Sequence, residues 1–214
     1  MGDFSRHSPV RFESEPVKTE VRDQWVVVTE YSHEGPGPWL VDLCHKTRWD
    51  LQDSRLDDRT PVGVSAPSIP GESRMNNRVL VSRLNRTQAA IWHLSSGETP
   101  ELPVEPGYTD VSEASAFLAL FGPKVFAIVE KLTALDFMQP DRQAPFLLQG
   151  PFSHVGCKIA VLAKEKNGSG AILLTCARGY AEAMVCAILS AGAAYGLRPA
   201  GESRFTSWLA ALQD

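Results

Sequence analysis

Short runs of β-branched and aromatic residues recur along the chain, and turn-forming residues separate them. Runs of this kind, bounded by Gly, Pro or Asn, predict β-strands. We expect strands at residues 25–29, 39–43, 47–51, 79–84, 88–94, 115–121, 155–162 and 171–176. Short turns join 79–84 to 88–94 and 155–162 to 171–176, so each of these pairs predicts an antiparallel hairpin.

Two further segments carry apolar residues at helical spacing. Pro123 opens the first, because a proline at the first helical position costs no hydrogen bond, and the apolar stripe then extends to Leu135. The second segment spans 179–195 and is followed by Gly196, a residue suited to ending a helix. The pattern therefore predicts an α+β fold of antiparallel sheets with helices on one face, close to the split βαβ (ferredoxin-like) arrangement.

The ends of the pattern suggest how the chain is organised. Residues 1–23 alternate charged residues, Ser and Pro, so we expect a flexible N-terminal arm. Residues 24–214 then form a single domain. Residues 52–77 lack apolar periodicity and predict a long surface loop, and such loops commonly meet a ligand or another chain. We expect the arm and this loop to contact a partner.

Composition narrows the function classes. The chain has 43% hydrophobic and 21% charged residues and a formal net charge of -4. This charge gives no attraction to nucleic acid or anionic membranes, so neither is expected as a partner. No signal-peptide pattern and no apolar stretch of membrane-spanning length occurs, which predicts a cytoplasmic protein. The four cysteines form no metal or dithiol motif, and Cys157, Cys176 and Cys186 lie in apolar runs typical of buried thiols.

Several segments, taken in order, carry a family resemblance. They include residues 41–46, 110–112, 118–124, 131–136, 178–182 and 190–201. Together they resemble the glycine-cleavage T-protein (aminomethyltransferase) family, which includes the gamma subunit of heterotetrameric sarcosine oxidase. The resemblance covers about residues 40–201. It implies a pseudo-repeated sheet-and-helix fold that encloses tetrahydrofolate in the catalytic relatives.

The sequence also departs from the family pattern where ligands are expected. Cys44 replaces the family's Ser, the stretch 92–98 lacks the usual Asn and nearby carboxylate, and 174–180 lacks the acidic pterin anchor unless Glu182 replaces it. The sequence ends at Asp214, where catalytic relatives continue into domains that close the folate channel. The resemblance thus implies no complete catalytic site. The positions that could still contact tetrahydrofolate are Asp42, His45, Asp110, Arg178, Tyr180 and Glu182.

Three functional interpretations remain open. The first is a non-catalytic accessory subunit of a folate-linked, amine-oxidising complex, with flavoprotein oxidase subunits as partners and no cofactor of its own. The second is a stand-alone tetrahydrofolate-dependent aminomethyl- or methyltransferase in which Asp110, Glu98 or Glu101 supplies the missing carboxylate. The third is a scaffold that kept the fold and lost the ligand. No metal site is expected, because no His, Cys or carboxylate cluster has metal-ligand spacing.

Two local alternatives concern the segment after residue 41. Asp42 and His45 could form an acid–base pair, since a neighbouring carboxylate orients an imidazole and raises its pKa. They could equally belong to a turn in which Asp42 accepts backbone N–H groups. Cys44, next to cationic residues, could be a reactive thiol or an inert one.

Overall fold

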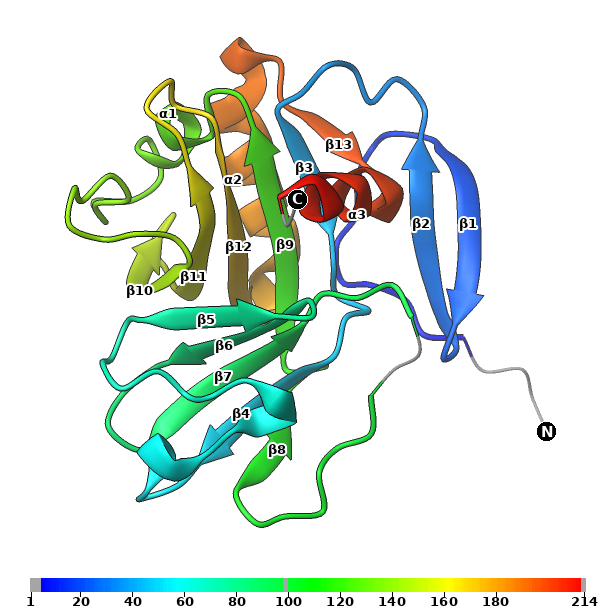
Figure 1. Cartoon of the computed structure of the whole chain (residues 1–214). Coiled ribbons are helices and arrows are strands. Elements are labelled where there is room, and N and C mark those ends of the chain that lie inside the picture. The colour runs from blue at the N-terminus through cyan, green and yellow to red at the C-terminus, as the bar shows by residue number, and fades with distance from the viewer. Residues whose placement is uncertain (1–4, 98–99, 213–214) are drawn as a thin grey trace.

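The computed structural model describes residues 5–97 and 100–212, and these residues form three β-sheets with α-helices between and beside them (Figure 1). No helix in these residues is long and apolar enough to cross a membrane. The fold is α+β, as the alternation of strand and helix patterns predicts.

The largest sheet has six strands and lies at the centre of the molecule. β9 and β12 are buried along almost their whole length, which explains their continuous apolar runs: both faces of this sheet are covered. β3 and β13 pair in parallel, so the sheet is mixed and not purely antiparallel as expected. Its strands, in spatial order, are β10 (Phe146–Phe152), β11 (Val155–Lys164), β12 (Gly170–Ala177), β9 (Ser115–Gly122), β3 (Trp39–Asp42) and β13 (Arg198–Ala200).

A five-stranded antiparallel sheet packs below the first. The predicted hairpin at 79–94 is confirmed within it, with Ser82 opposite Ala90. The ring of Trp92 meets Phe117 of the central sheet edge to face, with 5.1 Å between centroids, so aromatic packing joins the two sheets. Its strands, in spatial order, are β5 (Ser73–Asn76), β6 (Val79–Arg83), β7 (Gln88–His93), β4 (Arg48–Gln52) and β8 (Tyr108–Asp110).

The third sheet is a two-stranded ribbon of β1 (Pro16–Arg22) and β2 (Trp25–Tyr31). This differs from the flexible arm expected at 1–23, of which residues 1–4 lie outside the described residues. β1 is polar at alternate positions and would not form a strand alone, but the buried face of β2 provides a template. Trp25, Val27 and Thr29 bury this face, and Glu34 ties the end of the ribbon to the body through Tyr31 N and Gly201 N.

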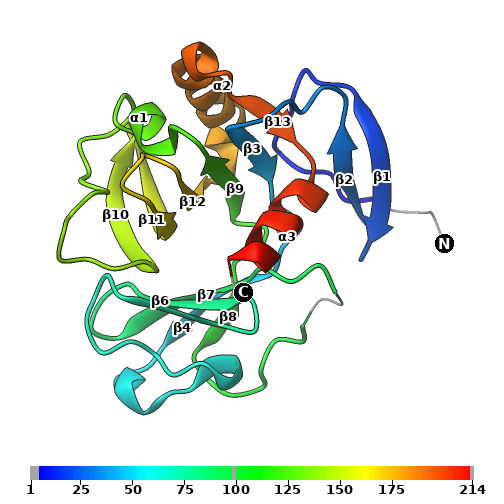
Figure 2. The same ribbon diagram turned by 45° about the horizontal axis from the view of Figure 1, so that its top comes forward.

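Helices lie on both faces of the central sheet, whereas the sequence predicted one face. α1 (Val125–Val129) and α2 (Ala181–Gly192) lie together on one face, and α3 (Glu202–Ala211) lies on the other, beside β2 (Figure 2). The rings of Phe205 and Trp208 of α3 lie 5.7 and 5.4 Å from that of Phe121 on β9, which fixes α3 to the sheet. α1 ends at Val129, whereas the apolar stripe predicted a helix that extends to Leu135.

The remaining differences are elements that the sequence pattern missed. The segment 52–77, expected as a loop, contains two short 3₁₀ turns and the strand β5. β8, β10, β13 and α3 were also not predicted. β5, β8 and β13 have only three or four residues each and depend on neighbouring strands for their hydrogen bonds, so their own sequences carry little signal.

Candidate functional site

The site begins at a tight turn between β3 and β4. Asp42 Oδ1 accepts a hydrogen bond from Cys44 N at 2.9 Å, and Lys46 N donates to Leu43 O at 2.8 Å. This is an Asx-type turn, which an Asp at its first position favours. The turn reading of Asp42 is therefore the one that the structure supports, and it places His45 and Lys46 side by side.

A buried arginine holds this turn from below. Arg48 is 1% exposed, and its guanidinium donates to Lys46 O at 3.0 Å, to Ser115 O at 2.9 Å and to Ser112 O. It also lies over the ring of Phe117 at 4.8 Å. Burial lowers the pKa of Arg48 to about 10, and the carbonyl oxygens take the place of a direct carboxylate partner. The Arg48 side chain thus fixes the turn and links β4 to the start of β9.

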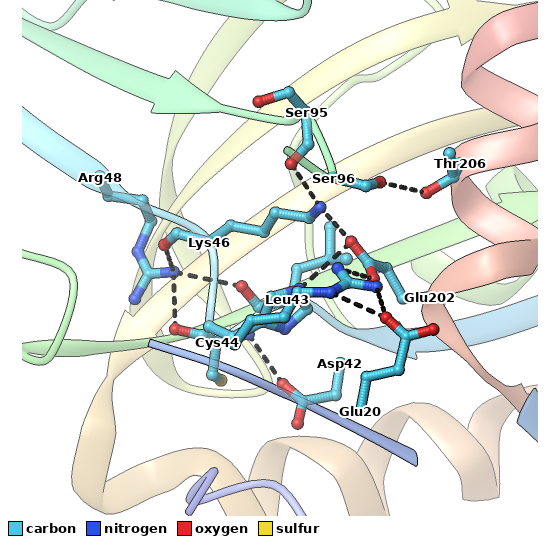
Figure 3. A network of polar contacts seen from close by, with 12 residues as sticks. Glu20, Asp42, Leu43, Cys44, Lys46, Arg48, Ser95, Ser96, Glu202 and Thr206 are labelled. Carbon is cyan, nitrogen blue, oxygen red and sulfur yellow. Dashed lines mark hydrogen bonds and ion pairs between the residues drawn. The ribbon is translucent and has the colours of Figure 1, made fainter. Parts of the chain in front are cut away.

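Beside the turn, the carboxylate of Glu202 binds basic side chains from two other segments, β1 and the β3–β4 turn (Figure 3). Glu202 is the first residue of α3 and is 1% exposed. Its Oε2 accepts from Arg22 of β1 at 2.5 Å, and its Oε1 accepts from Lys46 Nζ. Lys46 Nζ also donates to Ser95 O at 2.7 Å. The β1–β2 ribbon, the β3–β4 turn and α3 therefore all contribute a side chain to one buried ionic cluster around the Glu202 carboxylate.

His45 is the third basic neighbour of Glu202. Its Nε2 lies 3.3 Å from Glu202 Oε1, an ion-pair distance, but this nitrogen is buried and makes no hydrogen bond of good geometry. Lys46 and Arg22 are therefore the hydrogen-bonded partners of the carboxylate, and His45 lies close enough to lower its pKa as well. His45 is the member of the cluster that retains hydrogen-bonding capacity.

The charges in this cluster stabilise one another. Burial raises the pKa of Glu202, but His45 and Lys46 oppose it more strongly, and the net effect places this pKa well below its usual range. Burial lowers the pKa of Lys46, and the negative charge of Glu202 opposes part of this decrease. A carboxylate held ionised by two cations is a poor proton acceptor at neutral pH. The arrangement is suited to clamping three segments and not to acid–base catalysis by Glu202.

A cavity of about 230 Å³ lies next to the clamp, between the ribbon and the turn. Asp42, His45 and Tyr31 contribute polar side chains to its wall, and Trp25 contributes an apolar one. Burial, followed by the nearby charge of Asp42, raises the pKa of Tyr31, so its hydroxyl stays protonated and can donate. The cavity could bind a small molecule that offers a hydrogen-bond donor to Asp42.

The size and lining of this cavity bear on whether it could hold folate. Pockets that bury drug-sized ligands usually measure roughly 300–1,000 Å³, and this cavity, at about 230 Å³, is smaller. It brings together only Asp42 and His45 of the six predicted folate positions. The volume of this cavity is therefore below the range typical of sites that enclose a drug-sized ligand, and four of the six predicted folate positions lie outside its wall.

The other four predicted positions lie elsewhere. Asp110 ends β8 and is exposed, with Oδ1 accepting from Ser112 N at 2.8 Å. Arg178 follows β12 and donates to His7 O at 3.2 Å, and its Nη1 is buried without a partner. Tyr180 and Glu182 are exposed at the start of α2. These residues do not converge with Asp42 and His45 on one cavity.

The alternative carboxylates and the cysteines can also be placed. Glu101 is exposed in the loop after residue 100, and Glu98 lies outside the described residues. Cys44 is fully buried, and burial, followed by Asp42, raises its pKa, so the reactive-thiol reading is wrong. Cys186 is exposed, contrary to the prediction, while Cys157 and Cys176 are buried. Among the described residues, no group of three His, Cys or acidic side chains could hold a metal ion.

The sequence missed four members of the site, namely Arg22, Tyr31, Arg48 and Glu202. Arg22 was assigned to the flexible arm, and Glu202 lay beyond the last recognised motif. A signal for Glu202 was present, because Phe205, Trp208 and Leu209 follow it at helical spacing and Gly201 precedes it. A helix that begins with a buried acid needs a basic partner, but nothing in the sequence identifies which one.

Comparison with known proteins gives one kind of match. No family model matches the chain, and no curated protein matches it in sequence. Its structure is similar to a chain of the heterotetrameric sarcosine oxidase from Corynebacterium sp. U-96, solved in complex with pyrrole 2-carboxylate. The TM-score is 0.60 at 17% identity, and the match covers 73% of this chain and 84% of that chain. At this level of identity, the two chains have a related fold.

Proposed function

We propose that this chain is an accessory subunit of a hetero-oligomeric, amine-oxidising flavoprotein complex and that it occupies the place of the gamma subunit of sarcosine oxidase. The fold likeness to a chain of such a heterotetramer is the observation that carries the proposal. The resemblance of several sequence segments to the T-protein family, which includes that gamma subunit, agrees with it. The partners in this proposal are flavoprotein oxidase subunits.

The chemistry of the site supports an accessory role. Its buried carboxylate, Glu202, is neutralised by Arg22 and Lys46 and serves to join segments. Its buried thiol, Cys44, has a raised pKa and is a poor nucleophile. The clamp therefore contributes to the shape of the subunit, and the redox chemistry belongs to the partner subunits.

The test is co-purification. The full chain is co-expressed with flavoprotein oxidase subunits from the same organism, and the complex is isolated through a tag on one of those subunits. We expect the chain to elute with them at constant stoichiometry in size-exclusion chromatography. Failure to associate under conditions where both sides are folded contradicts the proposal.

The loop at 52–77 supplies a surface variant for this test. Ile69 is an apolar residue that is 59% exposed in this segment, which we expect to contact a partner. Ile69→Asp is expected to weaken co-purification. Val104→Asp is the matched control, because Val104 is a fully exposed apolar residue of another loop, and this variant is expected to associate normally.

The stand-alone folate-dependent transferase remains the second candidate, because Asp42 offers an acidic group in a cavity next to His45. Calorimetry with tetrahydrofolate separates the two. Micromolar binding by the isolated chain that is lost in Asp42→Asn supports the transferase. Absence of binding together with stable association with the oxidase subunits supports the accessory subunit.

A further inference from the structure

The outer edge of β1 is the starting point. β1 has one neighbour, β2, so its other edge carries backbone groups without a strand partner among the described residues. Exposed strand edges pair readily with another strand unless charge, proline or a covering segment prevents it. Val17 and Val21 are 63% and 73% exposed along this strand. An open edge with exposed valines is therefore available for pairing.

The pairing of β1 with β2 indicates which residues of β1 direct their backbone N–H and C=O groups away from β2. Arg22 pairs with Trp25 across a two-residue turn, and such closing residues direct their backbone groups at each other. Lys18 O also faces β2, because Thr29 Oγ1 donates to it. The pairing with β2 is regular from Thr19 to Arg22, so the alternation of backbone direction along a strand places the N–H and C=O groups of Thr19 and Val21 outward. Around Val17 and Lys18 the register with β2 is irregular.

The sequence around Thr19 is complementary to itself. In an antiparallel pairing centred on Thr19, each Val17 lies opposite Val21 of the other strand, and each Lys18 lies opposite Glu20. Apolar pairs and opposite charges across strands are favourable, while like charges are not. Within one copy, the side chains of Lys18 and Glu20 are 63% and 40% exposed and lie 3.8 Å apart, and Arg22 also binds Glu20. In the paired strands, Lys18 would exchange this partner for Glu20 of the other copy.

Thr19 is the centre of this self-complementary sequence, and it is also a residue whose backbone groups face outward. Thr19 points its backbone groups outward, so Thr19 of each strand would form a hydrogen-bonded pair at a twofold axis, flanked by the Val17–Val21 pairs. A centre on Lys18 or Glu20 would direct the same groups inward. An isologous twofold contact requires self-complementarity of this kind.

We propose that β1 pairs with β1 of a second copy of this chain, antiparallel and centred on Thr19, to give a four-stranded sheet that joins two ribbons. The exposed side chains of Val17 and Val21 from both copies then form one apolar stripe on this sheet. The inference does not depend on the proposed function. It identifies the partner of this edge as a second copy of the chain itself.

Sedimentation velocity of the full chain over a concentration series tests the proposal. A concentration-dependent species of twice the monomer mass is expected. Thr19→Pro removes the central N–H without touching the β1–β2 ladder, and it should weaken the dimer by about tenfold or more. Val104→Asp, remote in sequence and fully exposed, should leave the dimer unchanged.

A charge-swap pair separates specific pairing from loss of folding. Lys18→Glu alone and Glu20→Lys alone place like charges opposite each other in the homodimer, so each variant should dimerise less than the wild type. An equimolar mixture of the two restores opposite charges at every position and should form a heterodimer. A wild-type chain that stays monomeric, or a dimer that ignores Thr19→Pro and the charge variants, overturns the proposal.

Discussion

Glu202 shows how one residue can hold a site together. Its carboxylate is buried with Lys46, whose side chain is 3% exposed, and with Arg22, which is 28% exposed. Removing one member of a buried ion pair leaves an uncompensated charge, which costs more than the pair itself contributes. The local stability of the site should therefore depend on the charge of this one residue.

The first prediction concerns Glu202→Gln. The amide keeps the shape of the side chain and one acceptor oxygen but removes the negative charge that compensates Lys46 and Arg22, so we expect a loss of about 3–5 kcal/mol in the free energy of unfolding. Urea titration followed by Trp fluorescence measures it. Glu113→Gln, which breaks the more exposed ion pair with Arg6, should cost less than about 1 kcal/mol. Equal losses in the two variants would contradict the clamp.

A second prediction is the pH dependence due to His93. Burial lowers the pKa of His93 to about 4 from 6.5. The unfolded chain therefore binds more protons between these values, and stability falls as the pH drops through this window, by at most about 1.4 kcal/mol per pH unit. His93→Gln cannot titrate, so its unfolding free energy should fall less steeply from pH 6.5 to 4. Parallel curves for the two proteins would exclude His93 as the source.

At this scale, the sequence located part of the site. The cluster of residues 42–46 was recognised, and the structure places Asp42 and His45 on one cavity wall. The sequence pattern does not show that Arg22 and Glu202 belong to this cluster, because the two residues are 180 positions apart along the chain. Only the folding of the ribbon against α3 makes them neighbours.

At the scale of elements, long apolar patterns were predictable and short polar ones were not. β9, β12 and α2 lie where their apolar residues predict them, since burial on both sides demands continuous apolar character. β1 was missed because none of its seven residues is buried, and its structure depends on pairing with β2. The segment at 146–152 contains Gly150 and Pro151, which predict a loop. It is nonetheless an edge strand, β10, where a proline is tolerated.

The third prediction concerns the junction of α3 with β2. A Cβ at Gly201 would lie 2.2 Å from the backbone C and O atoms of Thr29, so Gly201→Ala must push the helix and the ribbon apart. We expect a loss of about 1–3 kcal/mol or more in unfolding free energy, in line with overpacking elsewhere. Gly179→Ala, where a Cβ meets nothing within 4 Å, is the control and should be nearly neutral. Thermal unfolding by circular dichroism measures both.

On the scale of the whole molecule, the two peripheral sheets are attached to the central one in different ways. The five-stranded sheet meets it through a broad aromatic and aliphatic core and through the Asp50–Lys158 ion pair. The ribbon meets it through one face of β2, the Glu34 contacts and the Glu202 clamp. A two-stranded ribbon is marginal without such support, so it should open as a separate cooperative unit.

The last prediction follows from this asymmetry. Arg22→Ala removes the ribbon's link to Glu202, and amide hydrogen exchange in residues 16–31 should accelerate by about tenfold or more, because a lost link of roughly 1.4 kcal/mol raises the open population tenfold. Exchange in β9 and β12 should not change. Lys158→Met, which breaks the link between the other two sheets, should leave residues 16–31 unaffected. Uniform acceleration of all three sheets in Arg22→Ala would mean that the molecule opens as one unit and that the clamp has no local role.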